Sequence, residues 1–183
     1  DDSLTPDQKE FLEGIRNGGE VLLALISDIL DFSRIEKDKV ELERQPFSLR
    51  HCIEESLDMV EVQANQKGLK LGYCIDKETP DTIIEDHGRL RQVLVNLLSN
   101  AVKFTDEGEV SVSVSSEAIK GEMRQILFEV KDTGIGIAQD KMDRLFQPFD
   151  QLERSISQKR DGIGLGLAIS SRLVELMDGV IWA

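Results

Sequence analysis

Residues 93–104 read VLVNLLSNAVKF, and this stretch decides how the chain is expected to fold. Most of its residues are apolar, yet Asn96 and Asn100 lie four positions apart and therefore on one face of a helix. The same polar line includes three further side chains, Arg89, Gln92 and Lys103. Because a buried amide without a hydrogen-bond partner costs roughly 1–3 kcal/mol, this stripe predicts a polar partner for the helix.

The composition limits the classes of protein to which the chain can belong. Its 183 residues suit one or two domains, and 40% hydrophobic residues are enough for a packed core. The formal net charge of −13 argues against binding to nucleic acid or to an anionic membrane, because both need a basic surface. No apolar run is long enough to span a bilayer and no signal peptide is visible. We therefore expect a cytoplasmic location without membrane contact, although the parent protein could be membrane-anchored.

The two cysteines, Cys52 and Cys74, lack the spacing of a metal or redox motif. We expect both to be ordinary reduced and buried thiols, with neither a disulfide framework nor a zinc site behind them.

The first part of the chain predicts one long helix. Thr5 and Gln8 form a capping box around Pro6, which suits the first helical position. Apolar or small residues then recur at steps of three and four, at Leu12, Ile15, Gly19, Leu22, Ile26, Ile29 and Ser33. The pattern predicts a helix of roughly 35–40 residues that Pro46 ends, which fits a coiled coil or bundle stem and hence a homodimer. The alternative is a helix that lies across its own domain.

The rest of the chain alternates helical and strand patterns, so we divide the chain into domains 1–45 and 46–183. Ser48 caps and Gly68 ends the first helix of the second domain, and Asp86 caps the helix with the polar stripe. The expected helices are 49–67, one from Asp86, a short one near 139–145 and one from about 165 to 178. The expected strands are 69–75, 82–85, a hairpin of 109–115 and 125–131, and one that begins at 180–182. We expect an α+β fold: a long helical stem followed by a two-layer α/β sandwich, with helices on one face of an antiparallel or mixed sheet.

A glycine-rich segment, KDTGIGI (131–137), follows an expected strand. Asp132 lies at the end of that strand, where binding residues often occur. Gly134 and Gly136 allow close backbone approaches that a side chain would block. The alternative is a turn that merely needs two glycines.

A second glycine-rich segment, GIGLGLAI (162–169), opens a helix. Gly162, Gly164 and Gly166 leave backbone N–H groups at a helix N-terminus, where the helix dipole favours an anion. The pattern is neither a P-loop nor a Rossmann fingerprint. Three basic residues lie upstream in this acidic chain, Arg154, Lys159 and Arg160. They suggest a flexible basic lid over a polyphosphate, with ordinary loop solubility as the alternative.

The amide stripe and the glycine loops together suggest a metal–phosphate site. The side-chain oxygens of Asn96 and Asn100 could bind Mg²⁺, which prefers oxygen ligands and commonly shares substrate phosphates. Lys103 could reach those phosphates. The alternative is that both amides are hydrogen-bonded to backbone carbonyl groups.

Four segments together resemble the conserved boxes of one family. RLRQVLVNLLSNAVKFT (89–105) resembles the N box of sensor histidine kinase ATPase domains, and DTGIGI (132–137) resembles the G1 box. LFQPF (145–149) resembles the F box, and GIGLGLAI resembles the G2 box. LISDILDFSRIEKDKVELE (25–43) resembles the second dimerisation helix of hybrid-type kinases. The resemblance spans essentially the whole chain and implies a Bergerat ATP-binding fold in 46–183, preceded by a partial dimerisation helix in 1–45.

The resemblance also implies a role for each matching residue. Asn100 would hold Mg²⁺ with the help of Asn96, and Lys103 would approach the phosphates of ATP. Asp132 would accept a hydrogen bond from the adenine amino group. The remaining nucleotide-binding positions implied are Gly134, Gly136, Ile137, Phe146, Phe149, Arg154, Gly162, Gly164, Leu165, Gly166 and Leu167.

The sequence departs from the family pattern in several places. Asp161 replaces a common glycine and Ile163 a common threonine or serine, which could change the lid or the affinity for ATP. The H-E-x-R-x-P motif of the phosphoacceptor helix is absent, and His51 and His87 lack its flanking acid and proline. The family's closing strands would follow the final GVIWA. We therefore expect a fragment trimmed at both ends that binds ATP and Mg²⁺ without phosphorylating itself.

Three functions compete at this point. The first is the catalytic domain of a two-component sensor histidine kinase, which would transfer the γ-phosphoryl group to a histidine outside this chain and serve a response-regulator receiver domain. The second is an ATP hydrolase like the related gyrase and mismatch-repair enzymes. Those enzymes carry a glutamate at position 96, and an amide cannot act as a general base, so Asn96 favours the kinase. The third is a regulatory module that only binds ATP.

Overall fold

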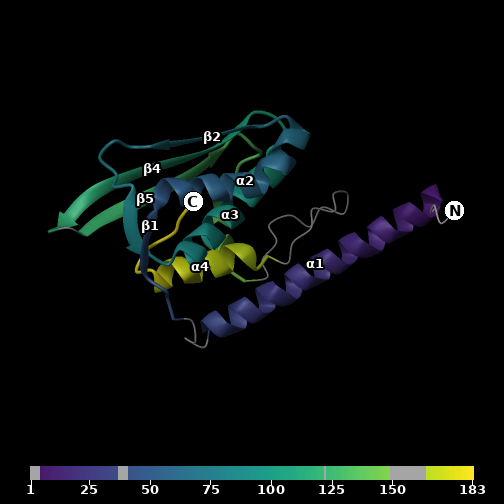
Figure 1. Cartoon of the computed structure of the whole chain (residues 1–183), viewed down its shortest axis with the longest axis horizontal. Helices are drawn as coiled ribbons and strands as arrows, with labels where there is room; N and C mark the ends of the chain where they lie inside the picture. Colours follow the sequence, from purple (N-terminus) through teal and green to yellow (C-terminus); the bar gives the residue numbers. More distant parts are fainter. Residues whose placement is uncertain (1–4, 37–40, 122, 149–163) are drawn as a thin grey trace. The chain divides into compact units, whose positions relative to one another are not determined.

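The computed structural model describes residues 5–36, 41–121, 123–148 and 164–183 (Figure 1). Its contacts divide the chain into two compact units, Asp1–Val40 and Glu41–Ala183. Within the described residues, no helix combines the length and the apolar character that crossing a membrane requires.

In the first unit the described residues form helix α1, Pro6–Glu36, preceded by Thr5. The predicted capping box is present, since Gln8 accepts a hydrogen bond from the Thr5 amide at 2.9 Å and donates one to Thr5 Oγ1 at 3.3 Å. Several large apolar side chains of α1 are exposed: Phe11, Leu12, Ile15, Leu22, Leu23, Ile26, Ile29 and Leu30. An exposed apolar face of this length is typical of a helix that packs against partner helices.

The predicted extension of this helix to Pro46 is wrong. Helix α1 ends at Glu36, residues 41–44 have no regular structure, and Pro46 lies inside strand β1, Gln45–Ser48. Among the residues that the structure describes, strand β1 pairs antiparallel with β3, Thr82–Glu85, and with no other strand, so both are edge strands there. An edge strand tolerates a proline because the missing N–H can face away from the partner.

The second unit contains a three-stranded sheet in the order β2-β4-β5 beside the small β1-β3 sheet. Its strands are β2 Lys70–Ile75, β4 Glu109–Lys120 and β5 Met123–Asp132. Strand β2 runs parallel to β4, while β4 and β5 form the predicted antiparallel hairpin. Its helices are α2 Leu49–Lys67, α3 His87–Phe104, the short 3₁₀ helix η1 Gln139–Arg144 and α4 Gly166–Leu176.

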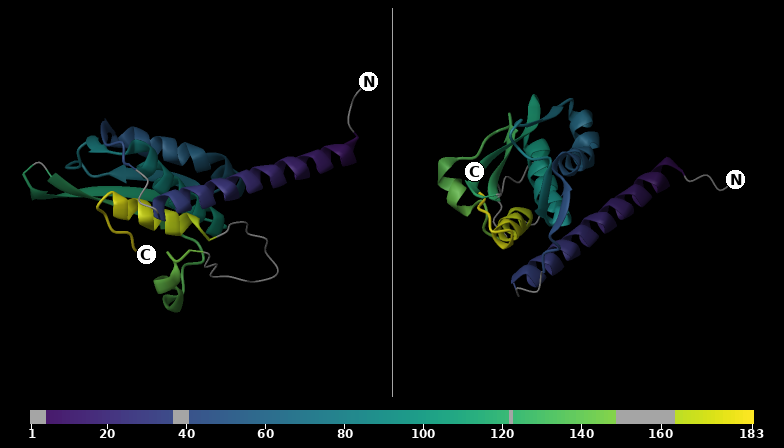
Figure 2. Two further views of the ribbon diagram at one scale, coloured as in Figure 1. Left: turned by 90° about the horizontal axis from the view of Figure 1, so that it is seen from below. Right: turned by 60° about the vertical axis from the view of Figure 1, so that its left-hand side comes forward.

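Helix α3 lies at the centre of this unit. Helices α2 and α3 cover one face of the three-stranded sheet, and α4 packs against α3 (Figures 1 and 2). Alternate valines of β4, at 110, 112 and 114, are buried beneath these helices. Contacts on several sides explain why α3 is apolar around most of its circumference, and they confirm the predicted α+β sandwich.

The local predictions differ in outcome. Ser48 and Asp86 cap α2 and α3, and Gly68 ends α2 in a left-handed conformation, as predicted. The predicted strand at 180–182 is wrong, because these residues have no strand partner among the described residues and Val180 and Trp182 are exposed. Cys52 is buried as expected.

The expected burial of Cys74 is wrong. This residue is exposed because it lies on the outward-facing side of β2.

Candidate nucleotide-binding site

The two stripe asparagines of α3 are half-buried and have different surroundings. Asn96 Nδ2 donates a hydrogen bond of 2.8 Å to Ser170 Oγ on α4. The Asn100 side chain makes no hydrogen bond within the described part of the chain. Neither amide is bonded to a backbone carbonyl there, so the alternative explanation of the stripe finds no support. An amide that is half-buried and without a protein partner is suited to a ligand.

The ends of α3 are held by charged side chains. At the N-terminus, Asp86 Oδ1 accepts a 3.0 Å hydrogen bond from the Arg89 amide. At the C-terminus, Lys67 Nζ of α2 donates to the carbonyl oxygens of Val102, Lys103 and Thr105 at 2.8, 2.9 and 3.0 Å. These carbonyls lie where helical acceptors lack intrahelical partners, so the ammonium group satisfies them and complements the helix dipole. Lys67 is not among the residues predicted from the sequence, because its carbonyl partners lie 35 to 38 positions further along the chain.

Strand β5 leads directly into the first glycine loop, which packs against the end of α3. Asp132 Oδ1 accepts a 2.8 Å hydrogen bond from the Gly134 amide and one of 3.4 Å from the buried Thr105 hydroxyl. The other carboxylate oxygen, Oδ2, accepts no hydrogen bond from the described residues and is free for a ligand. Thr133 Oγ1 accepts from the Glu109 amide at 3.0 Å and so ties the loop to β4.

The two glycines of this loop are needed for different reasons. A Cβ at Gly134 would lie 2.4 Å from the Phe104 carbonyl oxygen, so this position requires a glycine for close packing. Gly136 has a φ of 69°, which side-chain-bearing residues rarely adopt. The neighbouring Ile135 and Ile137 expose their apolar side chains. A fixed carboxylate beside exposed apolar surface is suited to a flat heteroaromatic ligand with an amino group.

The start of α4 has backbone N–H groups that no side chain at the N-cap position, Leu165, accepts from. Gly164 has a φ of 78°, and no side chain caps the helix at Leu165. The first N–H groups of a helix have no intrahelical acceptor, so this end of α4 suits an anion. Gly166 lies against the stripe, because a Cβ there would be 2.4 Å from Asn96 Oδ1. The amide stripe and the second glycine segment are thus adjacent.

The structure describes some of the remaining predicted site residues, and three of them lie outside the described ranges. Phe146 is half-buried on the segment after η1, Leu165 is buried and Leu167 is half-buried. Phe149, Arg154 and Gly162 lie outside the described residues. Lys103 is half-buried, with Nζ 5.4 Å from the centroid of the Phe104 ring.

The donor set is compatible with Mg²⁺ held jointly with phosphates. Among the described residues no group of three or more His, Cys, Asp or Glu side chains is arranged to hold a metal ion. Two amide oxygens four residues apart on one helix are hard ligands, yet too few to fill an octahedral shell. Such a site fits a Mg²⁺ ion that takes its other ligands from phosphates and water.

Comparisons with known proteins identify the class to which this fold and site belong. Residues 85–183 match the model of the histidine kinase-, DNA gyrase B- and HSP90-like ATPases. The histidine-protein kinase BarA of Escherichia coli K12 is 42% identical over 178 residues, which are 97% of this chain and 19% of BarA. The hybrid signal transduction protein dokA of Dictyostelium discoideum is 42% identical over 183 residues, which cover 99% of this chain and 11% of dokA. The solved structure of full-length ShkA in complex with AMPPNP is similar with a TM-score of 0.80 at 36% identity, covering 96% of this chain and 35% of that one.

The chain therefore belongs to the histidine kinase-, DNA gyrase B- and HSP90-like ATPase family. Within that family it is the ATP-binding catalytic domain of a two-component sensor histidine kinase, similar to hybrid kinases, as the sequence predicted. It spans about a fifth or less of the length of these two curated relatives.

Proposed function

We propose that this chain binds ATP together with Mg²⁺ and positions the γ-phosphoryl group for transfer to a histidine that lies outside it. The observation that carries the proposal is the half-buried Asn100 amide near the start of α4: among the described residues this amide has no hydrogen-bond partner, and Leu165 does not cap the helix. The relatives named as histidine kinases support transfer to histidine, and the ShkA structure contains an ATP analogue.

The base of ATP is assigned to the first glycine loop. Asp132 uses Oδ1 for the Gly134 amide and keeps Oδ2 for the adenine amino group. Gly136 gives the loop its left-handed turn, and Ile137 offers apolar surface to the ring. Phe146 and Phe149 are assigned to the base of the lid over the nucleotide.

The phosphates are assigned to the other two segments. The N–H groups at the start of α4, with Gly164, Leu165, Gly166 and Leu167, would receive the phosphate oxygens, and Lys103 would approach them from α3. Gly162 and Arg154 are assigned by sequence pattern alone. Asn96 and Asn100 would hold Mg²⁺, which neutralises phosphate charge and orients the phosphoryl group when bound.

Transfer to histidine is favoured over hydrolysis by the residue at position 96. Asn96 has no basicity with which to activate water, and its Nδ2 already donates to Ser170. What the site can provide is orientation of the phosphates and charge neutralisation, which are the main contributions in phosphoryl transfer.

The adenine assignment can be tested with Asp132→Asn. The substitution exchanges a charged acceptor for a neutral amide, so we expect the affinity for AMPPNP to fall about tenfold or more in calorimetric titration with Mg²⁺. Asp58→Asn on the exposed face of α2 removes the same charge and serves as the control. Equal affinities of the two variants would contradict the adenine assignment.

Autophosphorylation of this chain alone is not expected. Nε2 of His51 and Nε2 of His87 lie 3.3 and 3.1 Å from oxygens of the same Glu55 carboxylate, and neither histidine has the acceptor motif. Incubation with γ-labelled ATP and Mg²⁺ should leave no acid-labile label on the chain. A label that His51→Ala or His87→Ala removes would contradict this expectation.

The partners of the whole protein are proposed from the family. The exposed apolar face of α1 is assigned to homodimerisation, and the phosphoryl group is expected to pass on to a response-regulator receiver domain. Sedimentation that finds only monomer at high concentration would remove the dimer assignment for this chain.

A further inference from the structure

Ser170 is a buried serine that contacts the amide stripe from the neighbouring helix. Its side chain is 1% exposed, and its Oγ accepts the 2.8 Å hydrogen bond from Asn96 Nδ2. Ser170 lies four residues after Gly166 on α4, so both residues are on the same face of that helix. The serine therefore faces α3 and the stripe, away from solvent.

Gly166 confines the other end of the same amide. A Cβ at this position would lie 2.4 Å from Asn96 Oδ1 and 3.1 Å from its Cγ, so α4 and the amide are in close contact. Asn96 is thus restrained at its nitrogen by a hydrogen bond and at its oxygen by packing. A side chain restrained in this way loses little conformational entropy when it binds a ligand.

We propose that Ser170 is a positioning residue that fixes the Asn96 amide for the magnesium-bound nucleotide. The inference rests on the proposed function, because Asn96 matters to the nucleotide only if the stripe faces the metal. With Nδ2 bonded to Ser170, the amide oxygen packs beside Gly166 but accepts no hydrogen bond from the described residues, so it keeps its lone pairs for the hard cation that prefers oxygen ligands. Ser170 acts through Asn96 and does not itself contact the nucleotide.

The test separates the contribution of Mg²⁺ from the rest of the affinity. AMPPNP is titrated calorimetrically into the 183-residue chain, once with excess Mg²⁺ and once with EDTA. The Kd in EDTA divided by the Kd in Mg²⁺ gives a ratio that measures how much Mg²⁺ increases the affinity. We expect Ser170→Ala to reduce this ratio about three- to tenfold, the effect of one lost hydrogen bond, while Kd in EDTA stays nearly constant. Ser171→Ala is the matched control, since Ser171 is the half-buried neighbour on α4 with no side-chain hydrogen bond among the described residues. Its ratio should equal that of the wild type.

A double-mutant cycle shows whether Ser170 acts through Asn96. In an Asn96→Ala background, Ser170→Ala should cause no further reduction of the ratio, because the hydrogen bond is already absent. An equal reduction in both backgrounds would overturn the proposal. A loss of affinity in EDTA as large as that in Mg²⁺ would also overturn it, since this would show a general packing effect.

Two further measures keep the result decisive. If Ser170→Ala fails to fold by circular dichroism, Ser170→Cys, of similar volume and with a weaker acceptor, takes its place with the same expected direction. A wild-type chain that binds AMPPNP no better in Mg²⁺ than in EDTA would refute the proposed metal site itself. A wild-type chain with a clear Mg²⁺ effect that Ser170→Ala leaves unchanged would refute only the role of Ser170.

Discussion

At the scale of single residues, the position of Gly134 is set by the backbone of another element. The Cβ that any other residue carries would lie 2.4 Å from the Phe104 carbonyl oxygen and 2.9 Å from its carbon. Backbone atoms at the end of a packed helix cannot move aside as the tip of a flexible side chain can.

We therefore expect Gly134→Ala to lower the free energy of unfolding by about 1–3 kcal/mol in urea titrations. Gly72→Ala in strand β2 is the control, because nothing lies within 4 Å of the Cβ that it adds. Relief of glycine entropy should make this control about 0.5 kcal/mol more stable than the wild type. Equal stabilities of the two variants would show that the first glycine loop does not pack on Phe104.

The two cysteines differ in burial and therefore in chemistry. Cys52 is fully buried on the core-facing side of α2, and this burial raises the pKa of its thiol from an ordinary 9.0 to about 11. A folded-state pKa above the unfolded value means that the unfolded chain loses its proton first as pH rises. The neutral, buried Cys52 thiol therefore makes its full contribution to the free energy of unfolding below pH 9, and this contribution is lost between pH 9 and 11.

Two measurements test this difference. At pH 8 a thiol reagent should modify the exposed Cys74 quickly and Cys52 only on unfolding, so Cys74→Ser should remove the fast phase. The stability advantage of wild type over Cys52→Ala should shrink above pH 9, by about 2–3 kcal/mol in the limit of pH 11. A constant advantage across this range would contradict the raised pKa of Cys52.

At the scale of elements, the helix that carries the amide stripe depends on a single ammonium group at its C-terminus. Lys67 Nζ uses all three of its protons on the carbonyls of Val102, Lys103 and Thr105. The ion pair that Lys67 also makes with Asp106 is long, at 3.9 Å, so the carbonyl contacts dominate.

Replacing Lys67 by Met keeps much of the apolar stem and removes these three bonds. We expect a loss of roughly 1–2 kcal/mol in the free energy of unfolding, allowing for the partial exposure of the side chain. Lys77→Met in the exposed turn after β2 removes the same charge without such contacts and should change stability little. Faster hydrogen exchange in the last turn of α3 should accompany the loss only in the Lys67 variant.

The elements also show what the sequence can and cannot predict. Caps, alternation and helical periodicity are local, so α2, α3, the hairpin and α4 were predictable from neighbouring residues. Pairing between distant segments is not local: the hydrogen bond from Asn96 to Ser170 joins residues 74 positions apart, and Pro46 was read as a helix end because its partner Ile84 lies far along the chain. The glycine segments stood out by their local pattern, whereas the contacts of Lys67 with the end of α3 and of Ser170 with Asn96 join distant segments and were not predicted.

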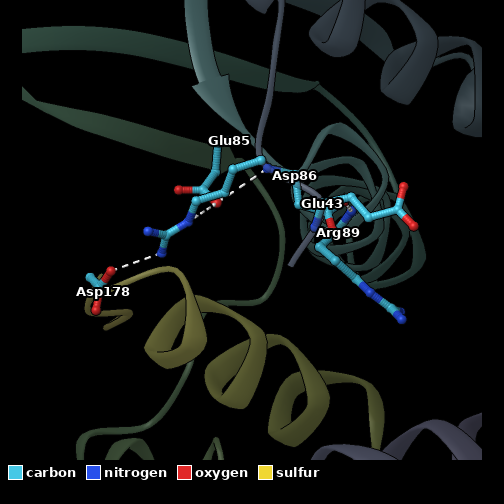
Figure 3. Close-up of polar contacts among 6 residues, drawn as sticks. Glu43, Glu85, Asp86, Arg89 and Asp178 are labelled. Carbon is cyan, nitrogen blue, oxygen red and sulfur yellow. Dashed lines mark hydrogen bonds and ion pairs between the residues drawn. The ribbon is translucent and has the colours of Figure 1, made fainter. Parts of the chain in front are cut away.

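At the scale of the whole molecule, Asp86 ties the segment that follows the first unit to α3, the helix that carries the amide stripe. Its buried carboxylate caps α3 with Oδ1 and accepts the Glu43 amide with Oδ2, each at 3.0 Å (Figure 3). Arg44 adds contacts to Glu85 at 3.1 Å and to Asp178, beyond the end of α4, at 2.8 Å. Because the Arg44 and Asp178 side chains are largely exposed, these ion pairs contribute little and Asp86 is the main anchor.

Asp86→Asn tests this anchor with almost no change in shape. A carboxamide has only one acceptor oxygen, so one of the two backbone N–H groups, of Glu43 or of Arg89, must lose its acceptor. We expect Glu43 to lose it, because its segment has no regular structure, whereas Arg89 is held in a packed helix. The Glu43 amide should then exchange with solvent much faster, with a loss of about 1–3 kcal/mol in the free energy of unfolding. Asp58→Asn, which removes the same charge from the exposed face of α2, should leave both amides as they are in the wild type. Unchanged protection of both amides in Asp86→Asn would show that the carboxylate does not anchor the segment.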